Sequence, residues 1–391
     1  MYKQQLCRRK LAAAVTAGLL LGTAACGSGD GGSAAARSTS KAGGTPAAEV
    51  TYAKQRIAKY SAKPPAFTAP GPPVKNVAGL KGKVVFYVPI GLKVPYFQVV
   101  LSGLRDAAAT AGLVLRPCDP NFSPSGVAQC LTQAANQNAG AVITDAIPPE
   151  FAQQAINLLK SRHIPILVSE EGSHPGTPEL AYNSGPTELM TSLAADWIIA
   201  DSNGTANIVL PEITDSAASI GYVENGAIPE IHKHCPGCKL TVFKTTTAQL
   251  SRLPSLISTA LVRDPKVNYI LSEFDADVAA IIQGLQTVTA ARHVKVASIN
   301  GVLQNLQFIA QGNYQAEDTG GNGYQLGWSD VDQVLRQMLG QPPLADQHNG
   351  IRVFTKDNVA GLTLTTQAAN TGEWYGSGDF KSVYTKLWGV G

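Results

Sequence analysis

The sequence has few charged side chains and almost no excess of either sign. Lys and Arg total 31 and Asp and Glu total 28 among 391 residues, for a formal net charge of +3. Residues 1–25 hold four of the basic side chains and no acidic one, so the rest of the chain carries a net charge of −1. Binding to nucleic acid or to an anionic membrane surface requires a strong basic excess, which this composition does not supply. We therefore expect no nucleic-acid partner.

Common catalytic motifs are also missing. The sequence contains no Walker A motif, no His-Glu-x-x-His and no Gly-x-Ser-x-Gly, and its histidines gather only at His232 and His234. In "GGNGYQLG" (320–327) the third glycine comes one residue too late for a dinucleotide fingerprint, so we interpret this stretch as a hinge turn that leads into a helix. Paired carboxylates such as Glu170 and Asp275 could in principle hydrolyse a glycoside. With no other catalytic feature, we expect that the chain is not an enzyme and uses no cofactor.

The N-terminal region has an apolar run that is too short to span a bilayer. "LAAAVTAGLLLGTAA" (11–25) follows the basic residues Lys3, Arg8, Arg9 and Lys10, which is the plan of a signal peptide. The small residues before Cys26 resemble a bacterial lipobox, with Thr23 in place of the usual leucine. We expect residues 1–25 to be removed and Cys26 to carry a lipid that anchors the chain to the outer face of the cell membrane. Ordinary cleavage, with Cys26 free or in a disulfide, is the alternative.

The residues after Cys26 have almost nothing to bury. Residues 27–48 consist mainly of Gly, Ser, Ala and Thr, and a Pro-rich stretch follows at 63–74. Such a composition is typical of a flexible linker. We therefore expect residues 26–78 to form a tether between the membrane anchor and the folded part.

Four further cysteines lie in the part that we expect to be exported. An oxidising compartment favours disulfides, and both Cys118 with Cys130 and Cys235 with Cys238 can be bridged. The second pair lies in "HKHCPGCKL", where His232 and His234 raise the alternative of a zinc site. We favour two disulfides and no metal.

From residue 80 onward, short apolar runs alternate with helical periods. "KVVFYVP" (83–89) is predicted to be a buried strand, and apolar residues at three- and four-residue steps predict a helix at 95–111. The alternation continues through the strand "VKVASIN" (294–300) and is typical of parallel sheets covered by helices on both faces. About ten such units are too many for one sheet, so two α/β lobes are expected.

The order of several segments resembles a known family. "VPYFQVVLSGLRDAAATAGLVL", "AVITDAIPPEFAQQAINLLKSRHIPILVSEE" and "YILSEFDADVAAIIQGLQ" resemble successive units of the type I periplasmic binding proteins of the ribose and galactose kind, the solute receptors of ABC importers. The resemblance covers about residues 80–355. It implies two Rossmann-like lobes joined by three crossing strands, near residues 183–185, 318–321 and 341–348. On this basis we assign 79–183 plus 319–345 to the N-terminal lobe and 184–318 plus 346–391 to the C-terminal lobe.

The resemblance also implies a ligand site between the lobes, at the carboxyl ends of the strands. In sugar-binding relatives an aromatic side chain at the start of the first helix stacks on the sugar ring, and Tyr96 and Phe97 occupy that place. Glu170 and Glu171 stand where ribose-type proteins have an Asp-Arg pair, which makes an amino sugar or another nitrogenous solute worth testing. The predicted ligand-binding residues are Tyr96, Phe97, Asp145, Glu170, Glu171, Asp215, Phe274, Asp275, Asn300 and Glu317. For the strand-end acids, helix capping is the alternative role.

These features predict an exported, monomeric solute-binding lipoprotein. Its ligand would be a small polar solute such as a sugar, a polyol or an amino sugar, and its partner would be the permease of an ABC importer. A membrane-tethered sensor that reports its ligand to a receptor is the alternative. The C-terminal aromatics Trp374, Tyr375 and Trp388 either pack on a lobe or line the cleft, and the sequence leaves both roles open.

Overall fold

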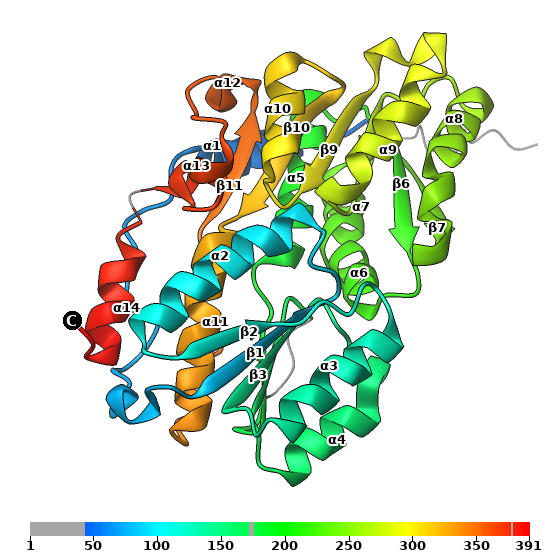
Figure 1. Ribbon diagram of the computed structural model, residues 1–391. Helices are drawn as coiled ribbons and strands as arrows, with labels where there is room; N and C mark the ends of the chain where they lie inside the picture. The colour runs from blue at the N-terminus through cyan, green and yellow to red at the C-terminus, as the bar shows by residue number, and fades with distance from the viewer. Residues whose placement is uncertain (1–43, 172–175, 377) are drawn as a thin grey trace, which may run out of the picture. The chain divides into compact units, whose positions relative to one another are not determined.

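Two sheets with helices on both faces make up the computed structural model, which describes residues 44–171, 176–376 and 378–391 (Figure 1). The strands are β1 (Val84–Pro89), β2 (Val114–Pro117), β3 (Ala141–Asp145), β4 (Ile166–Ser169), β5 (Leu180–Asn183), β6 (Asn207–Ile213), β7 (Lys239–Thr245), β8 (Tyr269–Leu271), β9 (Lys295–Ile299), β10 (Gln315–Gly321) and β11 (Ile351–Thr355). The expected signal peptide and Cys26 lie outside the described residues.

The helices are α1 (Ala47–Ser61), α2 (Pro95–Thr110), α3 (Pro124–Asn136), α4 (Gln153–Ser161), α5 (Thr187–Asp201), α6 (Ala217–Tyr222), α7 (Ile228–His234), α8 (Leu253–Arg263), α9 (Asp275–Gln286), α10 (Leu303–Gln311), α11 (Gly323–Met338), α12 (Lys356–Val359), α13 (Thr366–Ala369) and α14 (Phe380–Trp388). Shorter helical turns are η1 (Val77–Leu80), η2 (Pro149–Ala152), η3 (Val223–Ala227), η4 (Thr247–Arg252), η5 (Thr289–His293) and η6 (Glu373–Tyr375). None of the helices in the described ranges is long and apolar enough to cross a bilayer.

The first lobe is built on a parallel sheet of order β2-β1-β3-β4-β5. Its inner strands are short, β-branched runs buried on both faces, as a covered parallel sheet requires. Helices α2 and α11 pack together on one face, and α3 and α4 pack on the other. The predicted helix at 95–111 corresponds to α2, which begins at Pro95, a residue suited to the first turn.

The second lobe has the strand order β11-β10-β9-β8-β6-β7, in which only β11 runs antiparallel to its neighbour. Helices α5 and α7 cover one face of this sheet, and α8 and α9 cover the other. Two parallel-sheet lobes flanked by helices confirm the predicted fold class.

The chain passes between the two sheets at three places in this part of the sequence. It leaves β5 at Asn183 and begins α5 at Thr187, and it leaves β10 at Gly321 and begins α11 at Gly323. After α11, residues 339–350 return it to β11. The stretch "GGNGYQLG" therefore is the turn into a helix that the sequence indicates, with the Asn322 side chain accepting a hydrogen bond from the Gln325 N–H at 3.1 Å.

The expectation of a flexible tether over residues 26–78 is wrong for its second half. Residues 47–61 form α1, which packs on α5, α7 and β11 of the second lobe, and Ala53 is fully buried there. Downstream, Val74, Val77 and Leu80 pack into the core of the first lobe. The composition suggested a linker because the stretches on either side of α1, 27–48 and 63–74, are rich in small residues and proline. Between them, Ala53, Ile57 and Tyr60 pack on the core of the second lobe.

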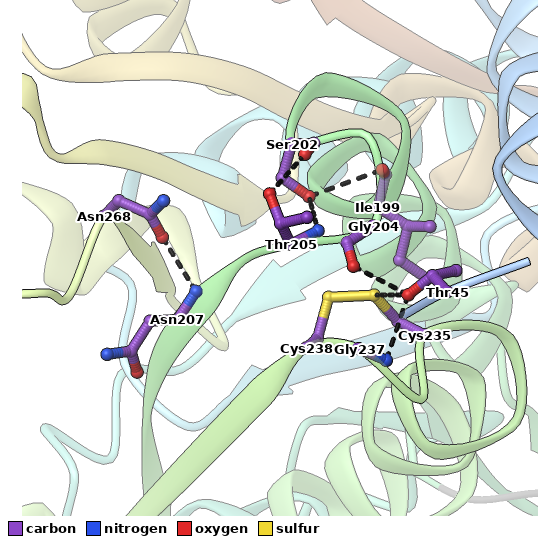
Figure 2. Close-up of a disulfide and its surroundings, with 10 residues drawn as sticks. All are labelled: Thr45, Ile199, Ser202, Gly204, Thr205, Asn207, Cys235, Gly237, Cys238 and Asn268. Atoms are coloured by element: carbon purple, nitrogen blue, oxygen red, sulfur yellow. Dashed lines mark hydrogen bonds between the residues drawn. A yellow bond between two sulfur atoms is a disulfide. The ribbon is translucent and has the colours of Figure 1, made fainter. Parts of the chain in front are cut away.

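Both predicted disulfides are present, and they join Cys118 to Cys130 and Cys235 to Cys238. Figure 2 shows that Thr45, just before α1, lies against the second one. The Thr45 hydroxyl donates to the Gly204 carbonyl at 2.7 Å and accepts from the Gly237 N–H at 3.0 Å. The cysteines of this turn are thus oxidised rather than available as zinc ligands, and the His234 Nδ1 lies 2.5 Å from Glu49 on α1.

The C-terminal segment does not stay on one lobe, contrary to the assignment of 346–391 to the C-terminal lobe. Strand β11 pairs with β10, and Trp374 packs beside it with α10. Helix α14, however, packs in the core of the first lobe, where Trp388 stacks on Trp328 of α11 with ring centroids 5.4 Å apart. Apolar spacing shows that α14 has a buried face but not which lobe covers it.

Candidate functional site

Two carboxylates of the first lobe follow neighbouring parallel strands. Asp145 is the last residue of β3, and Glu170 comes directly after β4. Both side chains are buried, and Glu170 has a left-handed backbone with φ +56°. Non-glycine residues adopt this conformation rarely, and they are enriched at functional sites. The sheet thus places both carboxylates at the edge where open α/β sheets bind ligands.

Tyrosines fix the orientation of this pair. The Tyr96 hydroxyl, in the first turn of α2, donates to Glu170 Oε1 at 2.9 Å, and the Tyr87 hydroxyl on β1 donates to Asp145 Oδ2 at 2.7 Å. Burial raises the pKa of Glu170 well above its ordinary range, and the charge of Asp145 adds to the rise. Burial also raises the pKa of Asp145 to about 6, although hydrogen bonds from Tyr87 and Glu170 lower it. Burial therefore opposes the ionisation of both members of the pair at once.

Glu171 is a buried carboxyl with spare hydrogen-bonding capacity. Its side chain is 4% exposed, and Oε1 has no hydrogen-bond partner among the described residues. Burial, together with the charges of Glu150 and Asp145, raises its pKa to about 8. A ligand that donates a hydrogen bond or carries a positive charge would satisfy this oxygen.

Tyr222 links the two lobes at this point. It ends α6 in the second lobe, and its hydroxyl donates to the backbone carbonyl of Glu170 in the first lobe. Its ring lies edge-on to Phe274, with centroids 6.5 Å apart. Phe274 is half-buried and immediately precedes α9. The carboxylates of the first lobe and the predicted aromatic of the second are therefore close in space.

The second lobe supplies its own pair of acids. Asp275, at the start of α9, accepts from the Ser298 hydroxyl at 2.5 Å and from the Val302 N–H at 2.8 Å. Asp318 on β10 accepts from the Gly301 N–H at 2.9 Å. Burial raises the pKa of Asp275 to about 7, and burial with the charge of Asp275 raises that of Asp318 well above its ordinary range. Burial therefore opposes the ionisation of both members of this pair at once as well.

Two further predicted residues lie beside the second pair. Glu317 is fully buried and accepts from the Thr319 hydroxyl at 2.5 Å, while its Oε2 has no partner among the described residues. Burial raises the pKa of Glu317 well above its ordinary range. Asn300 follows β9 with φ +119°, and its N–H donates to the Thr319 carbonyl at 3.2 Å. A residue held in this backbone region is again typical of a functional loop.

Two of the predicted site residues are placed elsewhere. Asp215 is exposed, and its carboxylate accepts from the N–H of Thr247 at 2.9 Å and from its hydroxyl at 3.0 Å. It does not cap the helix that follows it, because the N-cap of α6 is Ser216. Phe97 packs in the core of the first lobe, next to Tyr96. Phe97 belongs to the apolar pattern at helical steps in this stretch, and that pattern already favoured a position in the core.

Sequence reasoning missed Tyr87, Tyr222, Asp330 and the placement of Tyr375. Asp330 on α11 is fully buried and accepts from Ser169 at 3.1 Å and from Asn183 at 2.7 Å, so it holds the ends of β4 and β5. Tyr87 could have been found from its position two residues before the end of a strand beside β3. The other three come from helices or from the C-terminal segment, where no local pattern indicates an inward direction.

Charge sets this cluster apart from the rest of the protein. The cluster consists of the buried carboxyls of both lobes, namely Asp145, Glu170, Glu171, Asp275, Glu317, Asp318 and Asp330. Among the described residues, none of these carboxyls forms an ion pair with Lys or Arg. Buried carboxyls usually have a cationic partner or remain protonated. The cluster can therefore accept hydrogen bonds from hydroxyl or ammonium groups, and it offers no cation to an anionic ligand.

These features define a two-lobed α/β binding protein with a polar site where the lobes meet. A family model described as "Periplasmic binding protein domain" matches residues 85–342, more than half of the chain. The chain therefore belongs to the periplasmic binding protein family. Among curated protein sequences, none matches it significantly.

Solved structures show the same fold at low sequence identity. The 5-methylthioribose transporter solute-binding protein of Thermotoga lettingae matches with a TM-score of 0.66 and 16% identity, over 79% of this chain and 98% of its own. The sugar ABC transporter protein of Yersinia enterocolitica has a TM-score of 0.66 and 16% identity, over 82% and 98% of the two chains. A solute-binding protein of Burkholderia graminis in complex with D-arabinose has a TM-score of 0.63 and 20% identity, over 72% and 98%. These similarities establish the type I periplasmic binding protein fold.

Proposed function

We propose that this protein is the extracytoplasmic solute-binding component of an ABC importer and that it captures a small polyhydroxylated solute between its lobes. The observation that carries the proposal is the carboxyl cluster without cations at the strand ends of both lobes, where Tyr222 of one lobe donates to Glu170 of the other. Family membership supports this reading, since the match covers most of both lobes.

The proposed ligand is a sugar, a sugar-like polyol or an amino sugar. Carboxyl oxygens with unfilled acceptor capacity, as at Glu171 and Glu317, suit hydroxyl and ammonium donors. Tyr96 adds a ring for the apolar face of a sugar. Four structural neighbours were solved with 5-methylthioribose, allitol, D-allose or D-arabinose bound, all of them polyhydroxylated.

We also propose that the chain acts outside the cytoplasmic membrane, held there by lipidated Cys26. The two disulfides support this location because they persist in oxidising compartments. In this reading the closed, liganded form is what the permease recognises, since the family's mechanism depends on lobe closure.

A thermal-shift screen tests the proposal, because a ligand that binds only the native state raises the melting temperature. The chain without residues 1–25 is melted with D-glucose, D-glucosamine, D-allose, D-arabinose and allitol. Glucose and glucosamine differ only at one substituent, so the pair separates hydroxyl recognition from amine recognition. We expect at least one compound to raise the melting temperature.

Variants of the site then locate the binding. Glu170→Gln and Tyr96→Phe should each weaken binding about tenfold, the effect of removing a hydrogen bond to a charged or buried partner. Glu224→Gln, an exposed acid on η3, is the matched control and should bind as the parent does. If the compounds bind but the two site variants behave like the control, the ligand lies elsewhere and the proposed site is wrong.

A further inference from the structure

The C-terminal segment reaches the site although it lies outside the family match, which ends at residue 342. After β11 and α12, the chain forms α13 and then η6, whose last residue is Tyr375. Tyr375 is 8% exposed, and its ring lies edge-on to Phe354 with centroids 5.5 Å apart. The segment therefore adds an aromatic residue to a fold that is already complete in both of its sheets.

Strong contacts hold Tyr375 in place. The neighbouring Trp374 carbonyl accepts a hydrogen bond from Arg352 Nη1 at 2.7 Å, and the Trp374 indole N–H donates to the Thr363 carbonyl at 3.0 Å. Trp374 itself is fully buried. The position of Tyr375 is thus set by its neighbours and does not depend on a hydrogen bond from its own hydroxyl.

Two glycines leave room for that hydroxyl. A Cβ built on Gly301, after β9, or on Gly320, in β10, would come closer than 3.0 Å to the Tyr375 oxygen, a separation that real side chains essentially never show. Both glycines flank Asp318, since Gly301 donates to its carboxylate and Gly320 lies two residues further along the strand. The phenol oxygen therefore lies at the acid pair of the second lobe.

The hydroxyl has no hydrogen-bond partner among the described residues, although it is buried. Burial, followed by the charges of Asp318 and Asp275, raises the pKa of Tyr375 well above its ordinary range. Tyr375 in turn contributes to the raised pKa of Tyr96 in the first lobe. The hydroxyl thus lies beside the acids of the second lobe with its donor unused.

We propose that Tyr375 is a ligand-binding residue supplied by the C-terminal segment, and that its hydroxyl donates a hydrogen bond to an oxygen of the bound solute. This inference rests on the proposed function, and it assigns part of the specificity of the ligand site to the C-terminal segment. Phenylalanine would fill the same space against Phe354 and would not leave a buried hydroxyl without a partner, which costs free energy. An oxygen of the ligand would accept the hydrogen bond that this hydroxyl can donate.

The test compares Tyr375→Phe with a matched control, Tyr384→Phe. Tyr384 is another fully buried tyrosine of the C-terminal segment, but its hydroxyl donates to Gln347 at 3.0 Å. For each of the five screened compounds that binds the parent chain, Tyr375→Phe should bind about five- to tenfold more weakly by calorimetry, and Tyr384→Phe should bind unchanged. Equal affinities for Tyr375→Phe and the parent overturn the proposal and leave the proposed function standing.

The melting temperatures of the ligand-free variants provide an independent readout. Tyr375→Phe should melt at or above the parent temperature, because it removes a hydroxyl that bonds to nothing, whereas Tyr384→Phe should melt lower. If Tyr375→Phe loses as much stability as Tyr384→Phe, its hydroxyl is structural and the proposal fails. If the parent binds none of the compounds, the proposed ligand class is wrong and the proposal for Tyr375 falls with it.

Discussion

Glu171 shows how single residues in this site trade stability for binding capacity. It is buried beside Glu150 and Asp145 with an oxygen that bonds to no described residue, and its pKa is raised to about 8. The same cause, burial, raises the pKa of Glu273 to about 8 and of Asp275 to about 7. Keeping such groups neutral costs less than ionising them without a cation. A ligand cation would reverse that preference.

At this scale we predict that the ligand-free protein becomes less stable as the pH rises from 5 to 8.5. A carboxyl whose pKa is higher in the folded than in the unfolded chain keeps its proton longer in the folded chain, so the free energy of unfolding falls as pH rises between the two pKa values. Glu171→Gln should remove about 4 kcal/mol of this fall, measured by urea denaturation at both pH values. The exposed-site control Glu224→Gln should keep the full fall; equal pH profiles for the two variants would contradict the assignment.

The site also shows which residues a sequence can and cannot indicate. Asp145, Glu170 and Asp275 were predictable because the end of a parallel strand is recognisable from a short apolar run and a following acid. The same rule also selected Asp215, whose carboxylate bonds to Thr247, because a strand end alone does not distinguish a ligand contact from a structural one. Tyr222 and Tyr375 depend on how distant segments pack, and local spacing carries no such information.

Among the elements, helix α1 was missed although its sequence carries a helical pattern. One part of its contact is polar: Arg56 lies 2.6 Å from Asp196 of α5 and 2.8 Å from Glu230 of α7, and Tyr52 stacks on His234 with ring centroids 4.2 Å apart. The other part is apolar, since Ala53, Ile57 and Tyr60 recur at helical steps and pack on the core of the second lobe. The linker-like stretches on either side, 27–48 and 63–74, led to the interpretation of the whole region as a tether. The alternating α/β units were predictable because their buried faces are apolar.

For this element we predict that Arg56→Met lowers the free energy of unfolding by about 3 kcal/mol, because Asp196 is fully buried and would lose its cation. Urea denaturation measures the loss. Lys54→Met, an exposed cation on the same helix, is the control and should change little. The double variant Arg56→Met with Asp196→Leu should recover most of the stability. If Arg56→Met behaves like Lys54→Met, the ion pair does not hold α1 on the second lobe.

Over the whole molecule, the chain connects the lobes more often than the family's three crossings require. Residues 62–66 run from α1 on the second lobe to Phe67, which packs against Phe380 and Tyr384 of α14 on the first lobe. Likewise, Tyr375 packs in the second lobe whereas α14, which begins at Phe380, packs in the first. Both connections line a pocket of about 860 Å³ that also includes Asn183, Asn322 and Gly350 of the three crossings.

These two extra connections should restrict how far the lobes open. We test the first one by replacing Pro64 and Pro65 with glycine, since a Pro-Pro pair is stiff and extended whereas Gly-Gly is flexible. The ligand-free variant should have a larger radius of gyration by solution X-ray scattering. Its ligand affinity should fall about threefold, because a smaller fraction of the protein then lies near the closed form. Pro72→Gly with Pro73→Gly is the matched control, since that pair is exposed and Val74, next to it, packs in the first lobe. If the two double variants have the same radius of gyration and the same ligand affinity, the segment at 62–66 does not limit the movement of the lobes.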